Sequence, residues 1–215
     1  VYLTFDDGPG PYTEKLLDIL DRYNVKATFF VTNGKPDYQN LIAQEAQRGH
    51  TVAIHSASHD YAKIYQSVDA YFADFDEMNS IITAQTGKAA DLVRFPGGSS
   101  NTISKTYCYG IMSQLVCAVE ERGFRYCDWN VSSGDAGGTT STSQVVANVI
   151  EGIKSNNVSV VLQHDIKNFS VDAVEQIIQW GLSEGYTFLP MTSTTPMSHH
   201  GAVSYTHLTL PTNSL

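Results

Sequence analysis

The sequence is poor in positive charge, with 13 lysine and arginine residues against 22 aspartate and glutamate residues. Its formal charge at pH 7 is -9, and the basic residues are scattered along the chain. Binding to nucleic acid or to an anionic membrane surface needs clustered cations that face phosphate groups. We therefore exclude nucleic acid and anionic membranes as the main partners.

The sequence also lacks a long apolar run and a Gly-x-Gly-x-x-Gly motif. Without a run of roughly 20 apolar residues we expect no transmembrane segment, and the chain opens on a strand pattern rather than on a secretory leader. Any signal or anchor of the native gene is expected to have been removed before Val1. A dinucleotide-binding site of the Rossmann type is excluded, because no glycine fingerprint follows the first strand.

Cysteine is scarce, since only Cys108, Cys117 and Cys127 are present and none form a Cys-x-x-Cys pair. This count disfavours a thiolate zinc site and a dense disulfide framework. We expect mostly buried, apolar cysteines, with a single bridge between Cys108 and Cys117 as the alternative.

The chain of 215 residues contains 42% hydrophobic residues, which is enough for the core of one α/β domain. Short apolar, β-branched runs alternate with longer amphipathic segments. The predicted strands cover residues 2–6, 27–32, 51–55, 92–95, 124–131, 158–162 and 186–189. The predicted helices begin near residues 13, 37, 69, 103, 143 and 170. This alternation predicts a parallel sheet, either as an open doubly wound sheet or as a closed barrel.

Residues able to do chemistry follow the predicted strands at their carboxyl ends. They are Asp6, Asp7, His55, Arg94, Asp135 and His164. In both architectures the carboxyl edge of a parallel sheet carries the active site, so we expect these side chains to meet there.

Asp6 and Asp7 are adjacent at the end of the first strand and precede a Gly-Pro turn. Because neighbouring side chains on an extended chain point to opposite faces, we expect the two carboxylates to differ in role. One would bind a cation and the other would move a proton. The alternative is an ordinary solvated turn.

His55 and His59 are four residues apart, with only small residues between them. If the chain forms a helical turn there, both rings face the same side and bind one metal ion. Together with Asp7 they form a three-ligand set with an open position, which suits a catalytic Zn²⁺. The alternative is a pair of surface histidines with no ligand.

Three further groups are candidates for the reaction. We expect the Arg94 guanidinium at the rim of the site, unless it forms a surface ion pair, and the backbone N–H of Gly97 as an oxyanion donor. His164 is a candidate general acid if it is not simply a structural histidine. A carboxylate on its other ring nitrogen would raise its pKa, and Asp135 is the first candidate for that partner, with Asp128 the second.

Five segments resemble, in order, the motifs of the polysaccharide deacetylase family, also called the NodB-homology or carbohydrate esterase family 4 domain. They are Thr4-Phe5-Asp6-Asp7-Gly8, His55-Ser56-Ala57-Ser58-His59, Arg94-Phe95-Pro96-Gly97-Gly98, the stretch from Trp129 to Asp135, and Leu162-Gln163-His164. The resemblance covers roughly residues 1 to 195. It implies a deformed (β/α) barrel with about seven parallel strands.

The resemblance also implies a role for each matching residue. Asp6 would be the catalytic base and His164 the acid, while Asp7, His55 and His59 would hold the metal. Arg94 would orient Asp6, and Asp135 would tune His164.

The sequence departs from the family pattern at two places. Ala136 follows Asp135 where the family usually has Trp, and Gly97 stands where many members have Tyr. The second change keeps the backbone N–H but removes an aromatic wall of the sugar pocket. Phe95 and Trp129, with Tyr61 and Tyr65, are candidates for stacking on sugar rings, and the alternative for each is a core position.

We therefore expect metal-dependent removal of N-acetyl groups from a polysaccharide, with peptidoglycan N-acetylglucosamine first and chitin oligomers second. The alternatives are a catalytically weak carbohydrate-binding envelope domain and an enzyme for small amides or cyclic imides. Zn²⁺ is expected, with Co²⁺, Ni²⁺ and Mn²⁺ also suited to the ligands. We expect a monomer with an extracellular or envelope location, a catalytic domain over residues 1–197, and an unstructured, non-native tail over residues 198–215.

Overall fold

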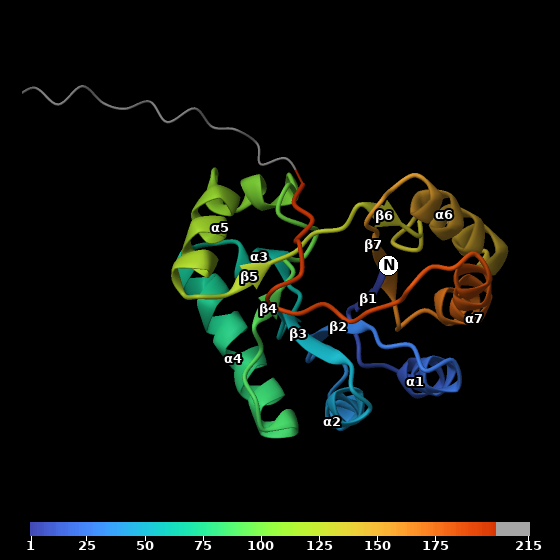
Figure 1. The fold of residues 1–215 in the computed structure, drawn as a ribbon. Helices are drawn as coiled ribbons and strands as arrows, with labels where there is room; N and C mark the ends of the chain where they lie inside the picture. Colours follow the sequence, from blue (N-terminus) through green and yellow to red (C-terminus); the bar gives the residue numbers. More distant parts are fainter. Residues whose placement is uncertain (201–215) are drawn as a thin grey trace, which may run out of the picture.

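The computed structural model describes residues 1–200 and contains an α/β half-barrel (Figure 1). Seven parallel strands form one sheet in the order β5-β4-β3-β2-β1-β7-β6. The strands are β1 Tyr2–Asp6, β2 Thr28–Thr32, β3 Thr51–Ser56, β4 Leu92–Val93, β5 Arg125–Tyr126, β6 Val131–Ser132 and β7 Val160–His164. Since β5 and β6 are edges, the sheet curls without closing, and the predicted deformed barrel is confirmed.

Helices pack around the outside of the sheet (Figure 1). They are α1 Thr13–Arg22, α2 Leu41–Gln47, α3 Tyr61–Ile64, α4 Val68–Thr86, α5 Ile111–Glu121, α6 Thr142–Lys154 and α7 Asn168–Ser183, with 3₁₀ turns at Pro36–Tyr38 and Ile103–Thr106. The predicted helices from about residues 37 and 103 are therefore shorter, and each is preceded by a 3₁₀ turn. Among the described residues no helix is long and apolar enough to cross a lipid bilayer.

Successive side chains of each strand point to opposite faces, and this alternation divides the core in two. In β2, Phe29 packs in the large cluster under the helices, whereas Phe30 lies in a small cluster inside the curve of the sheet. The inner cluster consists of Phe30, Ala53, Leu92, Cys127, Val160 and Met191. Side chains therefore fill the middle of the half-barrel. The candidate catalytic residues lie at one end of it, at the carboxyl edge of the sheet.

Two strand predictions are wrong. The segment predicted as one strand over 124–131 divides into β5 and β6, which lie on opposite edges of the sheet, and the connection between them crosses the opening (Figure 1). The segment 186–189 forms no strand, although Leu189 N donates to Val1 O at 3.0 Å and Val1 N donates to Thr187 O at 2.9 Å. In both places the curl of the sheet decides the pairing, and local propensity does not.

The cysteine predictions also need correction. All three cysteines are free, so no bridge joins Cys108 to Cys117. Only Cys127 is buried, whereas Cys117 is exposed and Cys108 is partly exposed.

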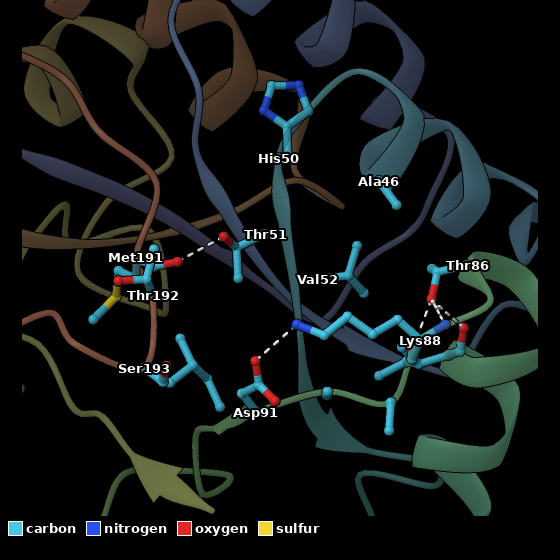
Figure 2. A pocket seen from close by; sticks show the side chains of 14 residues that line it. Ala46, His50, Thr51, Val52, Thr86, Lys88, Asp91, Met191, Thr192 and Ser193 are labelled. Atoms are coloured by element: carbon cyan, nitrogen blue, oxygen red, sulfur yellow. Dashed lines mark hydrogen bonds and ion pairs between the residues drawn. The ribbon is translucent and has the colours of Figure 1, made fainter.

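A cavity of about 440 Å³ lies by the amino ends of β3 and β4, away from the residues predicted to do chemistry (Figure 2). The charges of Lys88 and Asp91, which line it, pair with each other at 2.9 Å. None of the residues that line this cavity belongs to the five motifs of the sequence analysis.

Candidate metal centre and active site

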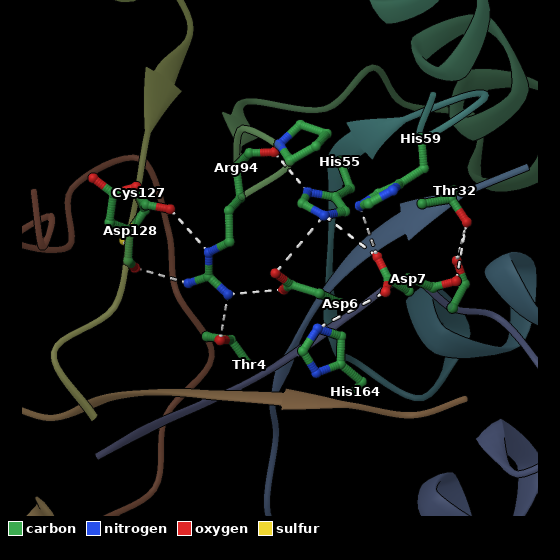
Figure 3. A network of polar contacts seen from close by, with 12 residues as sticks. Thr4, Asp6, Asp7, Thr32, His55, His59, Arg94, Cys127, Asp128 and His164 are labelled. Carbon is green, nitrogen blue, oxygen red and sulfur yellow. Dashed lines mark hydrogen bonds and ion pairs between the residues drawn. The ribbon is translucent and has the colours of Figure 1, made fainter. Parts of the chain in front are cut away.

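The predicted metal ligands Asp7, His55 and His59 converge at the carboxyl edge of the sheet (Figure 3). Asp7 Oδ1 lies 3.4 Å from His55 Nε2 and 3.3 Å from His59 Nε2. One donor atom from each residue lies within 4.8 Å of the others. Asp7 Oδ1 is buried and has no hydrogen-bond partner among residues 1–200, so the three groups fit a divalent cation between them.

The surroundings of Asp7 keep its carboxylate in the ionised form that can bind a cation. Burial works against its carboxylate, but the neighbouring histidines, His55 foremost, outweigh burial and lower the pKa of Asp7 below its usual range. The carboxylate is therefore ionised at neutral pH and available as a ligand.

His55 is held in the tautomer that a metal ligand needs. Its Nδ1 lies 2.7 Å from the carbonyl oxygen of Arg94, which only accepts hydrogen bonds. Nδ1 therefore carries a proton, so in the neutral ring the lone pair is on Nε2, the nitrogen that faces Asp7.

The backbone between the two histidines is not the helical turn on which the pairing was predicted. His55 belongs to β3, and His59 lies in the following turn with φ of 51°, while Asp7 has φ of 70°. Both values are in the left-handed region, which costs free energy for residues other than glycine and recurs at functional sites. The rings still approach, with centroids 5.1 Å apart.

A buried acid on α4, Asp74, holds this turn, and sequence reasoning missed it. Asp74 Oδ2 accepts hydrogen bonds from Ser56 Oγ at 2.6 Å and from Ala57 N at 2.7 Å. Asp74 Oδ1 accepts from Ser58 N at 2.9 Å. An aspartate among the apolar residues Tyr71, Phe72 and Phe75 on a helix is the one signal in the sequence that points to this role.

The two adjacent aspartates have different partners, but the chain is not extended through both of them as predicted, because β1 ends at Asp6 and Asp7 is left-handed. Asp6 lies between Arg94 and His55 and is 2% exposed, with Oδ1 bonded to Arg94 Nη1 at 2.8 Å. Its Oδ2 is 3.9 Å from His55 Nε2. Arg94 therefore fixes one oxygen of Asp6 and leaves the other beside the metal ligands.

Arg94 is fully buried inside the half-barrel, so its predicted place at the rim is wrong. Its guanidinium lies over the ring of Phe30 at 4.1 Å and donates to Thr4 Oγ1 and to the carbonyls of Cys127 and Asp128 (Figure 3). These donors leave no position for a surface ion pair. The structure thus places behind Asp6 a buried cation that makes four hydrogen bonds.

Asp135, the first of the two predicted partners, is the carboxylate that contacts His164. His164 Nδ1 is 2.8 Å from Asp135 Oδ1, so Nδ1 donates to the carboxylate and Nε2 faces the site, 3.8 Å from Asp7 Oδ2. Burial works against the imidazolium, but the hydrogen bond and charge of Asp135 outweigh it and raise the pKa of His164. Asp128 instead accepts from Ser99 N at 2.8 Å and is not the partner of His164.

The structure places the candidate oxyanion donor Gly97 and the aromatic candidate Trp129 at the surface, but it places Phe95 in the core. Gly97 is exposed, and its N–H donates to no residue in the described part of the chain, whereas Gly98 N donates to Phe95 O at 2.8 Å. Phe95 is fully buried against Tyr126, so the structure places it in the core rather than on a surface that a polymer touches. Trp129 is partly exposed and stays a candidate sugar contact.

The first residues of the predicted tail pack against this site. Ser198 O accepts from Asp128 N at 2.7 Å, and His200 N donates to Asp128 Oδ2 at 2.8 Å. The His200 ring meets that of Trp129 edge-on. Residues 198–200 contain no helix or strand but contact the domain, and residues 201–215 lie outside the described residues.

Asp7, His55 and His59 form a site for a divalent cation. A carboxylate and an imidazole lie next to it, and each is oriented by a charged partner. This arrangement is typical of a metal-dependent hydrolase. Residues 1–109 match the family model described as polysaccharide deacetylase. A peptidoglycan-N-acetylglucosamine deacetylase of Bacillus cereus is 34% identical over 193 residues, covering 87% of this chain and 67% of that protein. The chain therefore belongs to the polysaccharide deacetylase family.

Solved structures agree with this assignment. The catalytic domain of peptidoglycan N-acetylglucosamine deacetylase from Eubacterium rectale is 70% identical, with a TM-score of 0.93 over 94% of this chain and 93% of that one. A polysaccharide deacetylase from Bacillus cereus is 32% identical, with a TM-score of 0.77 over 92% and 95% of the two chains. Of the Listeria monocytogenes relative, a peptidoglycan-N-acetylglucosamine deacetylase, this chain covers 37%.

Proposed function

We propose that the chain hydrolyses the acetamide of N-acetylglucosamine in peptidoglycan and releases acetate. The observation that carries this proposal is the convergence of Asp6 and His164 on the group Asp7, His55 and His59. The similarity to the Eubacterium rectale catalytic domain supports peptidoglycan as the polymer. It also supports an envelope or extracellular location, because that is where the polymer lies.

The metal site would supply Lewis-acid catalysis. A divalent ion held by Asp7, His55 and His59 would polarise a carbonyl group and lower the pKa of water. We propose Zn²⁺, since two imidazole nitrogens and one carboxylate oxygen are a common ligand set for catalytic zinc.

The remaining steps belong to the side chains around this site. Asp6 Oδ2 takes a proton from the attacking water while a C–O bond forms at the acetyl carbon, and Gly97 N–H donates to the carbonyl oxygen as it becomes negative. His164 Nε2 then gives its proton to the nitrogen as the C–N bond breaks. The products are acetate and the amine of glucosamine, and no covalent enzyme intermediate forms.

Arg94 and Asp135 act through these two groups. Arg94 restrains Asp6 through Oδ1, so that the proton goes to Oδ2. Asp135 accepts from His164 Nδ1 and from the backbone N–H of His164 at 2.8 Å, which fixes both the tautomer and the position of the ring.

The test measures acetate release from peptidoglycan and from chitin oligomers, and ring opening of a small cyclic imide, each with the parent protein and with Asp6→Asn. We expect release from peptidoglycan to be fastest and to fall by about 10²-fold or more in Asp6→Asn, because the base is lost. Folded parent protein that binds the polymer but releases no acetate would support the carbohydrate-binding alternative. Faster turnover of chitin oligomers or of the imide would replace peptidoglycan as the substrate.

A further inference from the structure

Tyr61 lies between the metal ligands and the Gly97 turn. It is the first residue of α3, and its ring meets that of His59 edge-on with centroids 5.5 Å apart. A methyl group added at Gly97 would stand 2.8 Å from Tyr61 Oη. The hydroxyl of Tyr61 therefore adjoins the backbone of Gly97 while the ring rests against a metal ligand.

This hydroxyl has no hydrogen-bond partner among residues 1–200. The tyrosine directly after α3 behaves differently, because Tyr65 is fully buried and its Oη donates to Pro96 O at 2.7 Å. Tyr61 is only partly buried. Its hydroxyl therefore adjoins the exposed Gly97 backbone and makes no hydrogen bond that holds the fold of the described residues.

Gly97 N–H is the second free donor at this place, as described above. Two unpaired donors side by side, next to a metal ligand, resemble an oxyanion hole in which one donor is backbone and the other is a side chain. The left-handed φ of 77° at Gly97 favours glycine, and the absent Cβ leaves room for the hydroxyl.

We propose that Tyr61 is a further catalytic residue, whose Oη donates a hydrogen bond to the acetyl oxygen together with Gly97 N–H. The donated bond strengthens as that oxygen gains negative charge, so Tyr61 stabilises the transition state more than the bound substrate. This assignment rests on the proposed function, because it needs an acetamide at the site.

The test is Tyr61→Phe, which keeps the ring against His59 and removes only the hydroxyl. Loss of one oxyanion donor typically lowers kcat by about 10² to 10³-fold, and we expect about 10-fold or more here because the other donor remains. The KM should change less than kcat. Metal affinity and the thermal midpoint should match those of the parent, since the hydroxyl holds nothing in the described structure.

Tyr65→Phe is the matched comparison, because it removes a tyrosine hydroxyl four residues further on, at the end of the same short helix. It should lower the thermal midpoint, since the Pro96 carbonyl loses its buried donor. A Tyr61→Phe variant with kcat within twofold of an active parent would overturn the proposal, as would a raised KM with unchanged kcat. A parent protein that releases no acetate would instead overturn the proposed function.

Discussion

Asp74 offers a sharp test of how the fold positions the metal site. Although it is not a ligand, its buried carboxylate holds the turn that carries His59. We expect Asp74→Asn to weaken both the fold and metal binding. The amide has one acceptor oxygen in place of two and puts an NH₂ group against donors.

The expected size follows from the contacts. Each oxygen of Asp74 accepts two hydrogen bonds from the segment Ser56–Ser58, so Asn leaves two donors without an acceptor. Hydrogen bonds to a charged group contribute about 1.5–3 kcal/mol each, which gives a loss of about 3–6 kcal/mol. Since a domain is stable by only about 5–15 kcal/mol, this is a large effect.

Asp76→Asn is the matched control, because Asp76 lies on the same helix but is exposed and pairs with Arg122. An exposed ion pair contributes about 0–1 kcal/mol. Urea unfolding gives the free energies, and a metal titration gives the affinities. We expect Asp74→Asn to bind metal about 10-fold or more weaker than Asp76→Asn. Equal stability and equal affinity in the two variants would refute the role of Asp74.

Three other outcomes follow from buried charges. Asp135→Asn removes the group that raises the pKa of His164, so the alkaline limb of the kcat profile should move to lower pH; an unmoved limb would contradict the assignment of His164 as the acid. Burial, and then the charge of Asp165, raise the pKa of Glu45 well above its usual value, so the folded parent keeps a proton that the unfolded chain loses. Between the unfolded and the folded pKa of Glu45, the free energy of unfolding of the parent should therefore fall by about 1.4 kcal/mol per pH unit. Glu45→Gln should lack this loss. If urea unfolding gave the same difference in stability between the two proteins at pH 5 and at pH 8, the result would contradict this. Arg94→Gln leaves Asp6 buried without its cation and should cost about 3–5 kcal/mol, and a loss below about 1 kcal/mol in urea unfolding would show that the pair is not needed.

The metal site was predictable from sequence because it depends on a general property of parallel sheets. Asp7 follows β1 and His55 is the last residue but one of β3, and the carboxyl ends of such strands meet at one edge. The same property brings Asp6 and His164 together. The wrong helical turn at His55 did not matter, because the short spacing to His59 lets more than one backbone path join the rings.

What the sequence did not reveal depends on how the sheet curls. Arg94 follows a strand and so was expected at the rim, but its side chain falls on the inner face, above Phe30. Asp74 reaches its partners across 16 to 18 residues, and no local pattern encodes that contact. The contacts of residues 198–200 depend on the far end of the chain returning to Asp128.

The most direct test of the proposed metal site is whether acetate release depends on a metal ion. Chelator-treated protein should release no acetate from peptidoglycan, and added Zn²⁺ should restore release with one ion bound per chain. The same addition should restore nothing to His55→Ala, which lacks one of the three ligands. Full activity in the chelated parent, or full recovery of His55→Ala at the same Zn²⁺ concentration, would contradict the claim that Asp7, His55 and His59 hold the ion that the reaction needs.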